Sequence, residues 1–209
     1  HELKTPLALI KAYSAGIKDG MDDGTYADTI IKQTDQINRL IDKLLELSRI
    51  ERDLLKIERL DLIQIFNQCL ENFEIELNQN KIDIYKDFNG IQQIYFEADR
   101  DQIEKVFNNL ISNAIKYTVI PEIQIQFKDN LEEFEFIIEN ETNLKNLSQI
   151  KKIWEPFFVM EPSRNKHLTG TGLGLAIVKS ILTRHQLNHE VKVIDGKIQF
   201  QIHFSKPLL

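Results

Sequence analysis

The first residues of the chain, His1, Glu2 and Thr5, are of types that could take part in phosphoryl transfer. On a helix His1 and Thr5 share one face, and Glu2 stands beside them. An imidazole attacks phosphorus through a neutral ring nitrogen, and an ordinary histidine pKa of about 6.5 leaves that nitrogen free near pH 7. The carboxylate can orient or accept the proton on the other nitrogen. The alternative is that His1 is an exposed histidine without a role. Motifs elsewhere in the chain are needed to choose between these two interpretations.

A second polar group lies in the stretch 109–117 and could bind a metal-chelated phosphate. If this stretch is helical, Asn109, Asn113 and Lys116 fall on one side, and Tyr117 flanks them. Amide oxygens are hard ligands that suit magnesium, an ammonium neutralises phosphate charge, and the tyrosine can pack beside a base or ribose. A separate apolar stripe can pack on a sheet; it consists of Ile103, Val106, Phe107, Leu110 and Ala114. A plain polar helix surface is the competing interpretation of the two asparagines alone.

A third group is a glycine-rich turn that leads into a predicted helix over residues 172–185. It consists of Gly170, Thr171, Gly172, Leu173 and Gly174. Glycines lack β-carbons, so backbone amides of the turn can approach phosphate oxygens, and the helix N-terminus adds a favourable dipole. A dinucleotide-binding fold requires a strand immediately before such a turn, and no strand is predicted there. The turn also lacks the Gly-Lys-Ser/Thr ending of a P-loop. Arg164 and Lys166 in the preceding loop could meet phosphates as that loop closes.

The elements that position these groups divide into two predicted domains. Residues 1–55 form a predicted helical hairpin, because apolar residues recur at helical spacing on both sides of the turn at 22–24. The second helix carries a wide heptad stripe made of Ile30, Ile37, Leu40, Ile41, Leu44, Leu45, Leu47 and Leu54. Two helices cannot enclose such a stripe, so we expect the hairpin to dimerise into a four-helix bundle.

Residues 56–209 form the second predicted domain, joined to the hairpin by a hinge near residue 53. Helices are predicted over 63–78, 99–117 and 172–185, and strands over 56–62, 82–85, 95–97, 123–127, 134–138, 191–194 and 197–204. Asp195 and Gly196 predict the turn of a terminal hairpin. Strands and helices do not alternate regularly, so an α+β two-layer sandwich fits better than a doubly wound parallel sheet.

Composition narrows the classes of partner and compartment. The net charge of -6 argues against nonspecific binding to nucleic acid or to an anionic membrane, since both require a basic surface. Cys69 is the only cysteine and lies in an apolar run, so we expect a buried thiol and a reducing compartment. No stretch is long and apolar enough to span a bilayer, and no signal peptide is present. The chain starts without Met, so we expect a fragment whose upstream part is missing.

In this order, the string His1 to Pro6, the asparagine block at 109–117 and the glycine turn resemble the catalytic core of a bacterial two-component sensor histidine kinase. The resemblance covers nearly all of the chain. It implies a dimerisation and phosphotransfer hairpin followed by a two-layer α/β sandwich of the GHKL (Bergerat) ATPase type. It also implies ATP and Mg²⁺, phosphotransfer to an aspartate of a response-regulator receiver domain, and a full-length protein held in the cell membrane by upstream segments, with this part in the cytoplasm.

The resemblance also assigns roles to individual residues. It implies that His1 is autophosphorylated, that Glu2 is the general base, and that Thr5 helps to orient water when the regulator is dephosphorylated. Asn113 is the first choice as magnesium ligand and Asn109 the second. Residues 159–169 resemble the family's ATP lid, and residues 154–158 resemble the aromatic block at the base of that lid.

One block departs from the family pattern. Where family members carry Asp-x-Gly-x-Gly to bind adenine, this chain has Asn140, Thr142 and Leu144 in place of the acid and the glycines. An amide can still accept a hydrogen bond from the adenine amino group. Loss of a charged acceptor costs about 1–3 kcal/mol, or roughly 5- to 150-fold in affinity. We therefore expect weaker ATP binding than is usual in the family, or a remodelled adenine pocket.

Two alternatives remain at this point. The first keeps the fold but makes the protein a pseudokinase or a phosphatase-biased member with weak ATP binding. The second is of another class, a non-catalytic dimeric scaffold that carries an inert sandwich domain. Binding of ATP separates the first from a kinase, and indifference to changes at Asn113 and Gly172 would identify the second.

Overall fold

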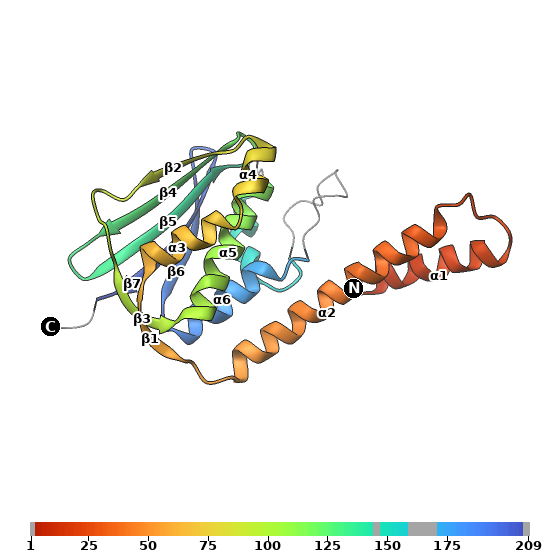
Figure 1. Cartoon of the computed structure of the whole chain (residues 1–209), viewed down its shortest axis with the longest axis horizontal. Helices are drawn as coiled ribbons and strands as arrows, with labels where there is room; N and C mark the ends of the chain where they lie inside the picture. The colour runs from red at the N-terminus through yellow and green to blue at the C-terminus, as the bar shows by residue number, and fades with distance from the viewer. Residues whose placement is uncertain (1–2, 144–146, 159–170, 207–209) are drawn as a thin grey trace. The chain divides into compact units, whose positions relative to one another are not determined.

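The computed structural model describes residues 3–143, 147–158 and 171–206. It contains a helical hairpin followed by a mixed sheet with helices, as predicted (Figure 1). The chain divides into two compact units, His1–Arg49 and Ile50–Leu209. The predicted domain limits, 1–55 and 56–209, and the hinge between them stay predictions. Within the described residues, no helix is both long enough and apolar enough to cross a membrane.

The first unit consists of α1 (Lys4–Lys18) and α2 (Tyr26–Arg52), whose last turn continues into the second unit. Between the helices, Asp22 Oδ1 accepts hydrogen bonds from the amides of Gly24 and Tyr26 at 2.9 and 3.2 Å. These bonds form the predicted turn and start α2. Much of the apolar surface stays exposed, including Leu7, Ile17, Ile31, Ile41 and Leu45. Leu54 does not belong to the stripe, because it lies beyond the end of α2 and is 90% exposed.

The second unit is built on a five-stranded sheet with the strand order β2-β4-β5-β7-β6. Its strands are β2 (Asp83–Asp87), β4 (Glu122–Asp129), β5 (Glu133–Glu141), β6 (Asn188–Ile194) and β7 (Lys197–Ser205). Only β2 and β4 are parallel. Asp195 and Gly196 both have positive φ, 50° and 79°, so the predicted hairpin turn is confirmed. A separate antiparallel pair joins β1 (Ile57–Asp61) to β3 (Tyr95–Asp99).

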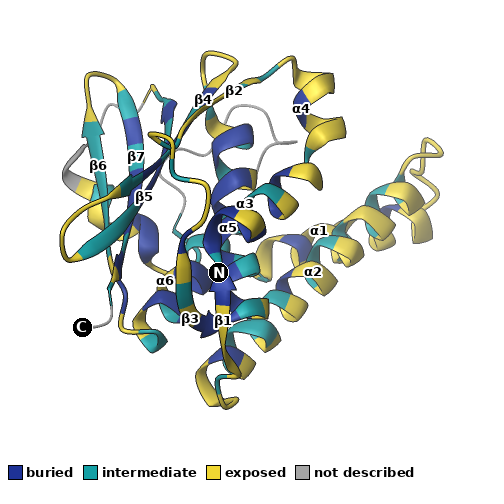
Figure 2. Ribbon diagram, turned by 60° about the vertical axis from the view of Figure 1, so that its left-hand side comes forward, coloured by how far each residue is buried: buried dark blue, intermediate teal, exposed yellow. Residues whose placement is uncertain are grey.

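Three helices cover one face of the five-stranded sheet: α3 (Leu62–Glu71), α5 (Arg100–Tyr117) and α6 (Gly174–Arg184) (Figures 1 and 2). A short α4 (Glu74–Asn80) and a 3-10 helix η1 (Leu147–Trp154) complete the unit. The interior between the layers is aromatic and fully buried, with Phe66, Phe107, Phe127, Phe136 and Phe204 at its centre. Cys69 on α3 is also buried, as predicted.

The predicted single helix over 63–78 is wrong, because the structure breaks it into α3 and α4. At the break, the amides of Asn72 and Phe73 bond to carbonyl oxygens three residues back, on Cys69 and Leu70. This tighter turn ends the α-helical pattern. It redirects the chain so that Leu77 of α4 is buried.

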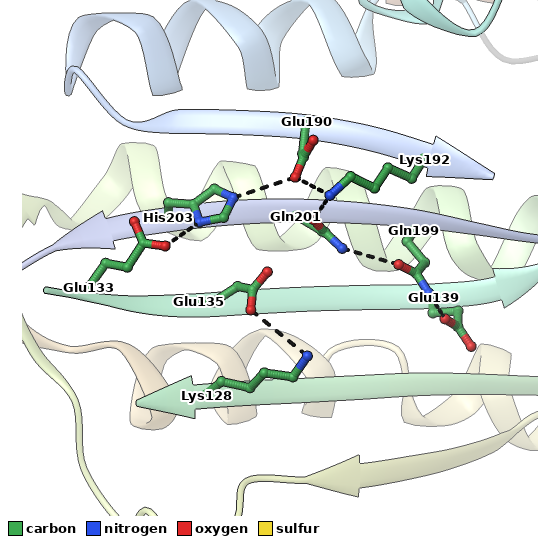
Figure 3. A network of polar contacts seen from close by, with 9 residues as sticks. All are labelled: Lys128, Glu133, Glu135, Glu139, Glu190, Lys192, Gln199, Gln201 and His203. Atoms are coloured by element: carbon green, nitrogen blue, oxygen red, sulfur yellow. Dashed lines mark hydrogen bonds and ion pairs between the residues drawn. The ribbon is translucent and has the colours of Figure 1, made fainter. Parts of the chain in front are cut away.

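The opposite face of the sheet carries a polar network instead of helices (Figure 3). His203 Nδ1 lies 2.8 Å from Glu133 Oε1, Lys197 Nζ lies 2.8 Å from Glu139 Oε1, and Lys128 Nζ lies 3.8 Å from Glu135 Oε2. Side chains alternate between the two faces of a strand, so a sheet with one polar face needs helices only on the other. The second unit therefore has two layers.

Candidate functional site

The asparagine block lies on α5, which the sequence forms as predicted. Asp99 caps the helix, since its Oδ1 accepts a hydrogen bond from the amide of Gln102 at 3.1 Å. The predicted apolar stripe is buried against the sheet. On another side of the helix, Asn109, Asn113 and Lys116 are only partly buried. The helix thus separates a packing face from a face that carries two amides and an ammonium.

Asn109 joins the asparagine block to the glycine turn. Its Nδ2 donates a hydrogen bond to the carbonyl oxygen of Lys105 at 2.8 Å, which fixes the orientation of the amide. Its Oδ1 lies against the start of α6, since a β-carbon built on Gly174 would lie only 2.7 Å from that oxygen. The first residue of α6 therefore has to be small for the Asn109 oxygen to keep its place.

Asn113, one turn further along α5, has a buried side chain nitrogen. This Nδ2 has no hydrogen-bond partner among the residues that the structure describes. Leaving a buried polar group unpaired costs about 1–3 kcal/mol. The amide can also rotate to present its oxygen at the same place, and an amide oxygen is a ligand that suits magnesium. Asn113 thus fits a site that a polar ligand or a metal completes.

Lys116 and Tyr117 form the end of this face. Burial lowers the pKa of the Lys116 ammonium from its ordinary value. Its Nζ lies 5.1 Å from the centre of the Tyr117 ring, which is 41% exposed. An anion near Lys116 would favour the charged ammonium again, so this residue suits a phosphate group.

The glycine turn is described from Thr171 onward. Gly172 has φ +65°, and its carbonyl oxygen accepts a hydrogen bond from the amide of Phe157 at 2.9 Å. A β-carbon on Gly172 would lie 2.8 Å from the Phe157 backbone, so only glycine fits. Leu173 is fully buried, and its amide donates to Thr171 Oγ1 at 3.4 Å. These contacts hold the chain as it enters α6.

The N-terminus of α6 has no side-chain cap among the described residues. The first amides of a helix have no partner within the helix itself, and the helix dipole favours negative charge there. Since Gly174 opens α6 and touches Asn109, these amides lie beside the asparagine block. The arrangement suits a phosphate chain that is bound on one side by α6 and on the other by the polar face of α5.

Asn140, the residue that stands in place of the family's acid, lies near the end of β5 and is 4% exposed. Its Nδ2 donates a hydrogen bond to the carbonyl oxygen of Glu141 at 3.1 Å. This bond orients the amide and leaves Oδ1 as its acceptor group. The amide of Thr142, at the position of the first missing glycine, donates to the carbonyl oxygen of Gly196 at 2.8 Å, so the chain stays bonded to the turn between β6 and β7 just after β5 ends. Leu144 lies outside the described residues.

Five of the predicted site residues lie outside the described part of the chain: His1, Glu2, Arg164, Lys166 and Gly170. Thr5 is described and is exposed in the first turn of α1. The grouping of His1, Glu2 and Thr5 therefore stays a prediction.

The sequence did not predict a role at the site for two residues that lie near it, Phe157 and Glu141. Phe157 has a positive φ of 64° and bonds to Gly172, so it holds the glycine turn and does more than fill the core. Glu141 has a carboxylate oxygen, Oε2, that is buried and has no partner in the part of the chain that the structure describes. The aromatic block at 154–158 hinted at the first of these, but nothing in the sequence pointed to the second.

The chain matches two family models. Residues 1–53 match the His Kinase A (phospho-acceptor) domain, and residues 98–208 match the histidine kinase-, DNA gyrase B-, and HSP90-like ATPase. The second match covers more than half of the chain, so the chain belongs to this ATPase family and has the ATP-binding domain of the family. With the phospho-acceptor domain in front of it, the chain is the catalytic core of a two-component sensor histidine kinase. These matches do not favour a pseudokinase or an inert scaffold.

Individual relatives agree with this assignment. Sensor protein SrrB of Staphylococcus aureus (strain N315) is 28% identical over 217 residues, which cover 99% of this chain and 37% of SrrB. The histidine kinase AdeS of Acinetobacter baumannii is 26% identical, with a TM-score of 0.75 over 98% of this chain and 97% of AdeS. The chain thus spans little more than a third of the curated relatives that it matches.

A second solved structure is similar to this chain in fold, at low sequence identity. The histidine kinase ThkA, solved in complex with response regulator protein TrrA, is 23% identical to this chain. Its TM-score is 0.80 over 99% of this chain and 59% of ThkA. Both units of the chain therefore have counterparts in a solved histidine kinase.

Proposed function

We propose that this core binds ATP with Mg²⁺ between α5 and α6, transfers the γ-phosphoryl group to His1, and passes it to an aspartate of a response-regulator receiver domain. The contact between the Asn109 oxygen and Gly174 carries the proposal, because it joins the metal-binding residue types to the phosphate-binding turn. Asn109 and the turn are 65 residues apart in sequence, so the fold alone brings them together.

The residues of the second unit bind and orient the nucleotide. Asn113, with Asn109 as a second ligand, would hold Mg²⁺, which lowers the charge on the phosphates and helps to align them. Lys116 neutralises phosphate charge, and Tyr117 packs beside the base or ribose. The backbone amides of Thr171, Gly172 and Gly174 donate to phosphate oxygens, joined by Gly170, Arg164 and Lys166 from the preceding segment. The Leu173 amide holds the turn through Thr171 Oγ1. Asn140 Oδ1 accepts a hydrogen bond from the adenine amino group.

The first unit supplies the acceptor of the phosphoryl group. A neutral ring nitrogen of His1 forms a bond to the γ-phosphorus, while the bond from that phosphorus to the bridging oxygen breaks and ADP leaves with the electron pair. Glu2 holds or accepts the proton on the other ring nitrogen. Since the phosphoryl group must reach both units in turn, the hinge predicted near residue 53 has to bend during the cycle. Thr5 orients water when the same core dephosphorylates its regulator.

We further propose that the core works as a homodimer and serves a receiver-domain partner. The exposed apolar residues of the hairpin support the dimer, since a monomer would leave this stripe in water. The complex of ThkA with response regulator protein TrrA supports the choice of partner. The relation to sensor protein SrrB supports a full-length protein anchored in the cell membrane, with this core in the cytoplasm.

The decisive test is autophosphorylation with γ-labelled ATP and Mg²⁺. The dimeric core should gain label that is labile in acid and stable in base, and His1→Gln should abolish the label. His203→Gln is the matched control, because this histidine lies on the opposite face of the sheet and should leave labelling unchanged (Figure 3). If no label appears while His1 is intact and ATP is shown to bind, the assignment of His1 is wrong.

A further inference from the structure

A pocket of about 660 Å³ lies at the edge of the five-stranded sheet, between α3, α4 and β2. Figure 1 shows β2 as the outermost strand, with α4 next to one of its ends. The lining includes Leu70 and Glu71 from α3, Glu74 and Leu77 from α4, and Ile84 and Lys86 from β2. None of the residues assigned to nucleotide binding lines this pocket. It therefore calls for an explanation of its own.

The strand beside the pocket has one free edge. Within the described residues β2 pairs only with β4, in parallel, and the Asp83 amide donates to the carbonyl oxygen of Pro121 at 2.8 Å. In a parallel pair, the N–H and C=O of one residue point to the same side, and successive residues alternate. The backbone groups of Asp83, Tyr85 and Asp87 thus face β4, while those of Ile84 and Lys86 face outward. The two residues with outward backbone groups are also the two residues of β2 that line the pocket.

Natural proteins often protect such an edge with a lysine that projects into solvent. Lys86 does not serve in this way, because its Nζ donates a hydrogen bond to Asn67 Oδ1 at 2.8 Å. Burial is the main reason that the pKa of Lys86 lies below its ordinary value, with Glu71 acting in the opposite direction. The ammonium is thus folded back over the wall of the pocket, and the edge stays accessible.

The pocket is apolar inside and acidic at its rim. Leu70 and Leu77 form its buried part, 9% and 8% exposed. Glu71 and Glu74 are exposed, and their two carboxylates outnumber the one ammonium in the lining, that of Lys86, on whose pKa Glu71 acts. This combination disfavours an anion and favours a ligand that carries an apolar group next to positive charges.

We propose that the free edge of β2 and this pocket bind an extended peptide segment of a partner protein, which adds a sixth strand to the sheet. The backbone of the segment pairs with Ile84 and Lys86, and an apolar side chain enters the pocket against Leu70 and Leu77. Side chains of a strand return to the same face every second residue. The segment therefore carries lysine or arginine two residues before and after the apolar residue, where they meet Glu71 and Glu74. This mode is β-strand addition with pocket selectivity, and it does not depend on the kinase reaction.

The test uses a fluorescein-labelled seven-residue probe, Thr-Lys-Thr-Leu-Thr-Lys-Thr, with blocked ends and the whole 209-residue chain, measured by fluorescence anisotropy. The probe should bind, and the same probe with glutamates for lysines should bind at least tenfold more weakly. A double substitution, Glu71→Gln with Glu74→Gln, should weaken binding at least fivefold. Glu132→Gln, an exposed acid at the turn between β4 and β5, is the matched control and should have no effect.

Backbone pairing between β2 and the probe is tested by changing first the protein and then the probe. Ile84→Pro removes an amide that faces away from β4, so the sheet can tolerate it at this edge while the probe loses its donor. It also replaces a side chain that lines the pocket, so it is read together with a change on the probe. N-methylation of alternate probe residues tests the same bonds without altering the protein. Both changes should reduce affinity at least tenfold. Equal binding of the glutamate probe, or no effect of N-methylation, would overturn the proposal. So would concentration-dependent dimers that Ile84→Pro abolishes in sedimentation, because a second copy would then occupy the edge.

Discussion

The contact between Asn109 and Gly174 makes Gly174→Ala the most informative single substitution in this protein. The backbone of Gly174 is not in the left-handed region, so alanine is allowed there. The new β-carbon, however, would lie 2.7 Å from Asn109 Oδ1, well inside contact distance. The amide of Asn109 is the flexible partner, so it will move away and the helix will stay in place. The substitution should therefore damage the site and spare the fold.

The expected magnitudes separate these two effects. Alanine is the better helix former by up to about 1 kcal/mol, less at a helix end. Moving Asn109 loses its bond to the carbonyl oxygen of Lys105, worth about 0.5–1.5 kcal/mol. The free energy of unfolding should thus fall by no more than about 1.5 kcal/mol. Loss of one polar contact to the phosphates or the metal costs about 1–3 kcal/mol, so ATP affinity should fall by about 5- to 150-fold.

Calorimetric titration with ATP and Mg²⁺, together with urea unfolding, measures both quantities. The control is a double-mutant cycle with Asn109→Ala. If Gly174 matters only through Asn109, each single variant should lose a similar factor in affinity, and the double variant should lose little more. Lys179→Ala, an exposed position on the same helix, should leave ATP affinity unchanged. Full affinity in Gly174→Ala, or losses that simply add in the double variant, would refute the inference that Gly174 acts on ATP binding through Asn109.

Three further outcomes are expected. Gly172→Ala should lower the free energy of unfolding in urea by more than about 1–2 kcal/mol, because it adds a backbone clash to left-handed strain; Gly196→Ala, equally left-handed but in open space, should lose less. Asn140→Asp should tighten ATP binding by about fivefold or more in calorimetry, and an unchanged Kd would exclude Asn140 from adenine recognition. Burial, aided by Glu104, raises the pKa of Cys69 to about 12, so the native thiol should resist a disulfide reagent at pH 8 until urea unfolds the chain. The unfolded thiol ionises first, so the free energy of unfolding should fall between about pH 9 and 12, by at most about 1.4 kcal/mol per pH unit.

The sequence predicted most of the secondary structure because periodicity is a local property. The apolar stripe of α5, the alternation in β4 and β5 and the turn at Asp195 and Gly196 each depend on residues close together in the chain. The break between α3 and α4 was not predictable, because neither Gly nor Pro marks it. Burial of Leu77 redirects the chain there, and that is a tertiary effect. The parallel pairing of β2 with β4 is likewise invisible in the sequence, since it joins strands that are 39 positions apart in register.

In the candidate site too, local features could be predicted from the sequence and tertiary contacts could not. Residue types and spacing predicted which side of α5 is polar and which residues open α6, because a helix fixes both. They could not predict that Asn109 touches Gly174, that Asn113 has an unpaired buried nitrogen, or that the Asn140 amide is oriented by Glu141. These facts depend on how two helices and a strand end meet. The same applies to the edge pocket, whose lining comes from three separate elements.

Three local exceptions to folding rules lie at the candidate site, although the second unit has other left-handed residues away from it, at Lys81, Gln186 and Asp195. Gly174 sits at a helical position where alanine would be intrinsically better. Phe157 holds a left-handed conformation that costs a residue with a β-carbon about 1–2 kcal/mol. Asn113 keeps a buried nitrogen without a described partner. Through Asn109 and Gly172, the first two are in direct contact with the asparagine block and the glycine turn. Exceptions of this kind persist where binding requires them, so a ligand that satisfies Asn113 should also stabilise the left-handed residue at 157 and slow exchange of its amide.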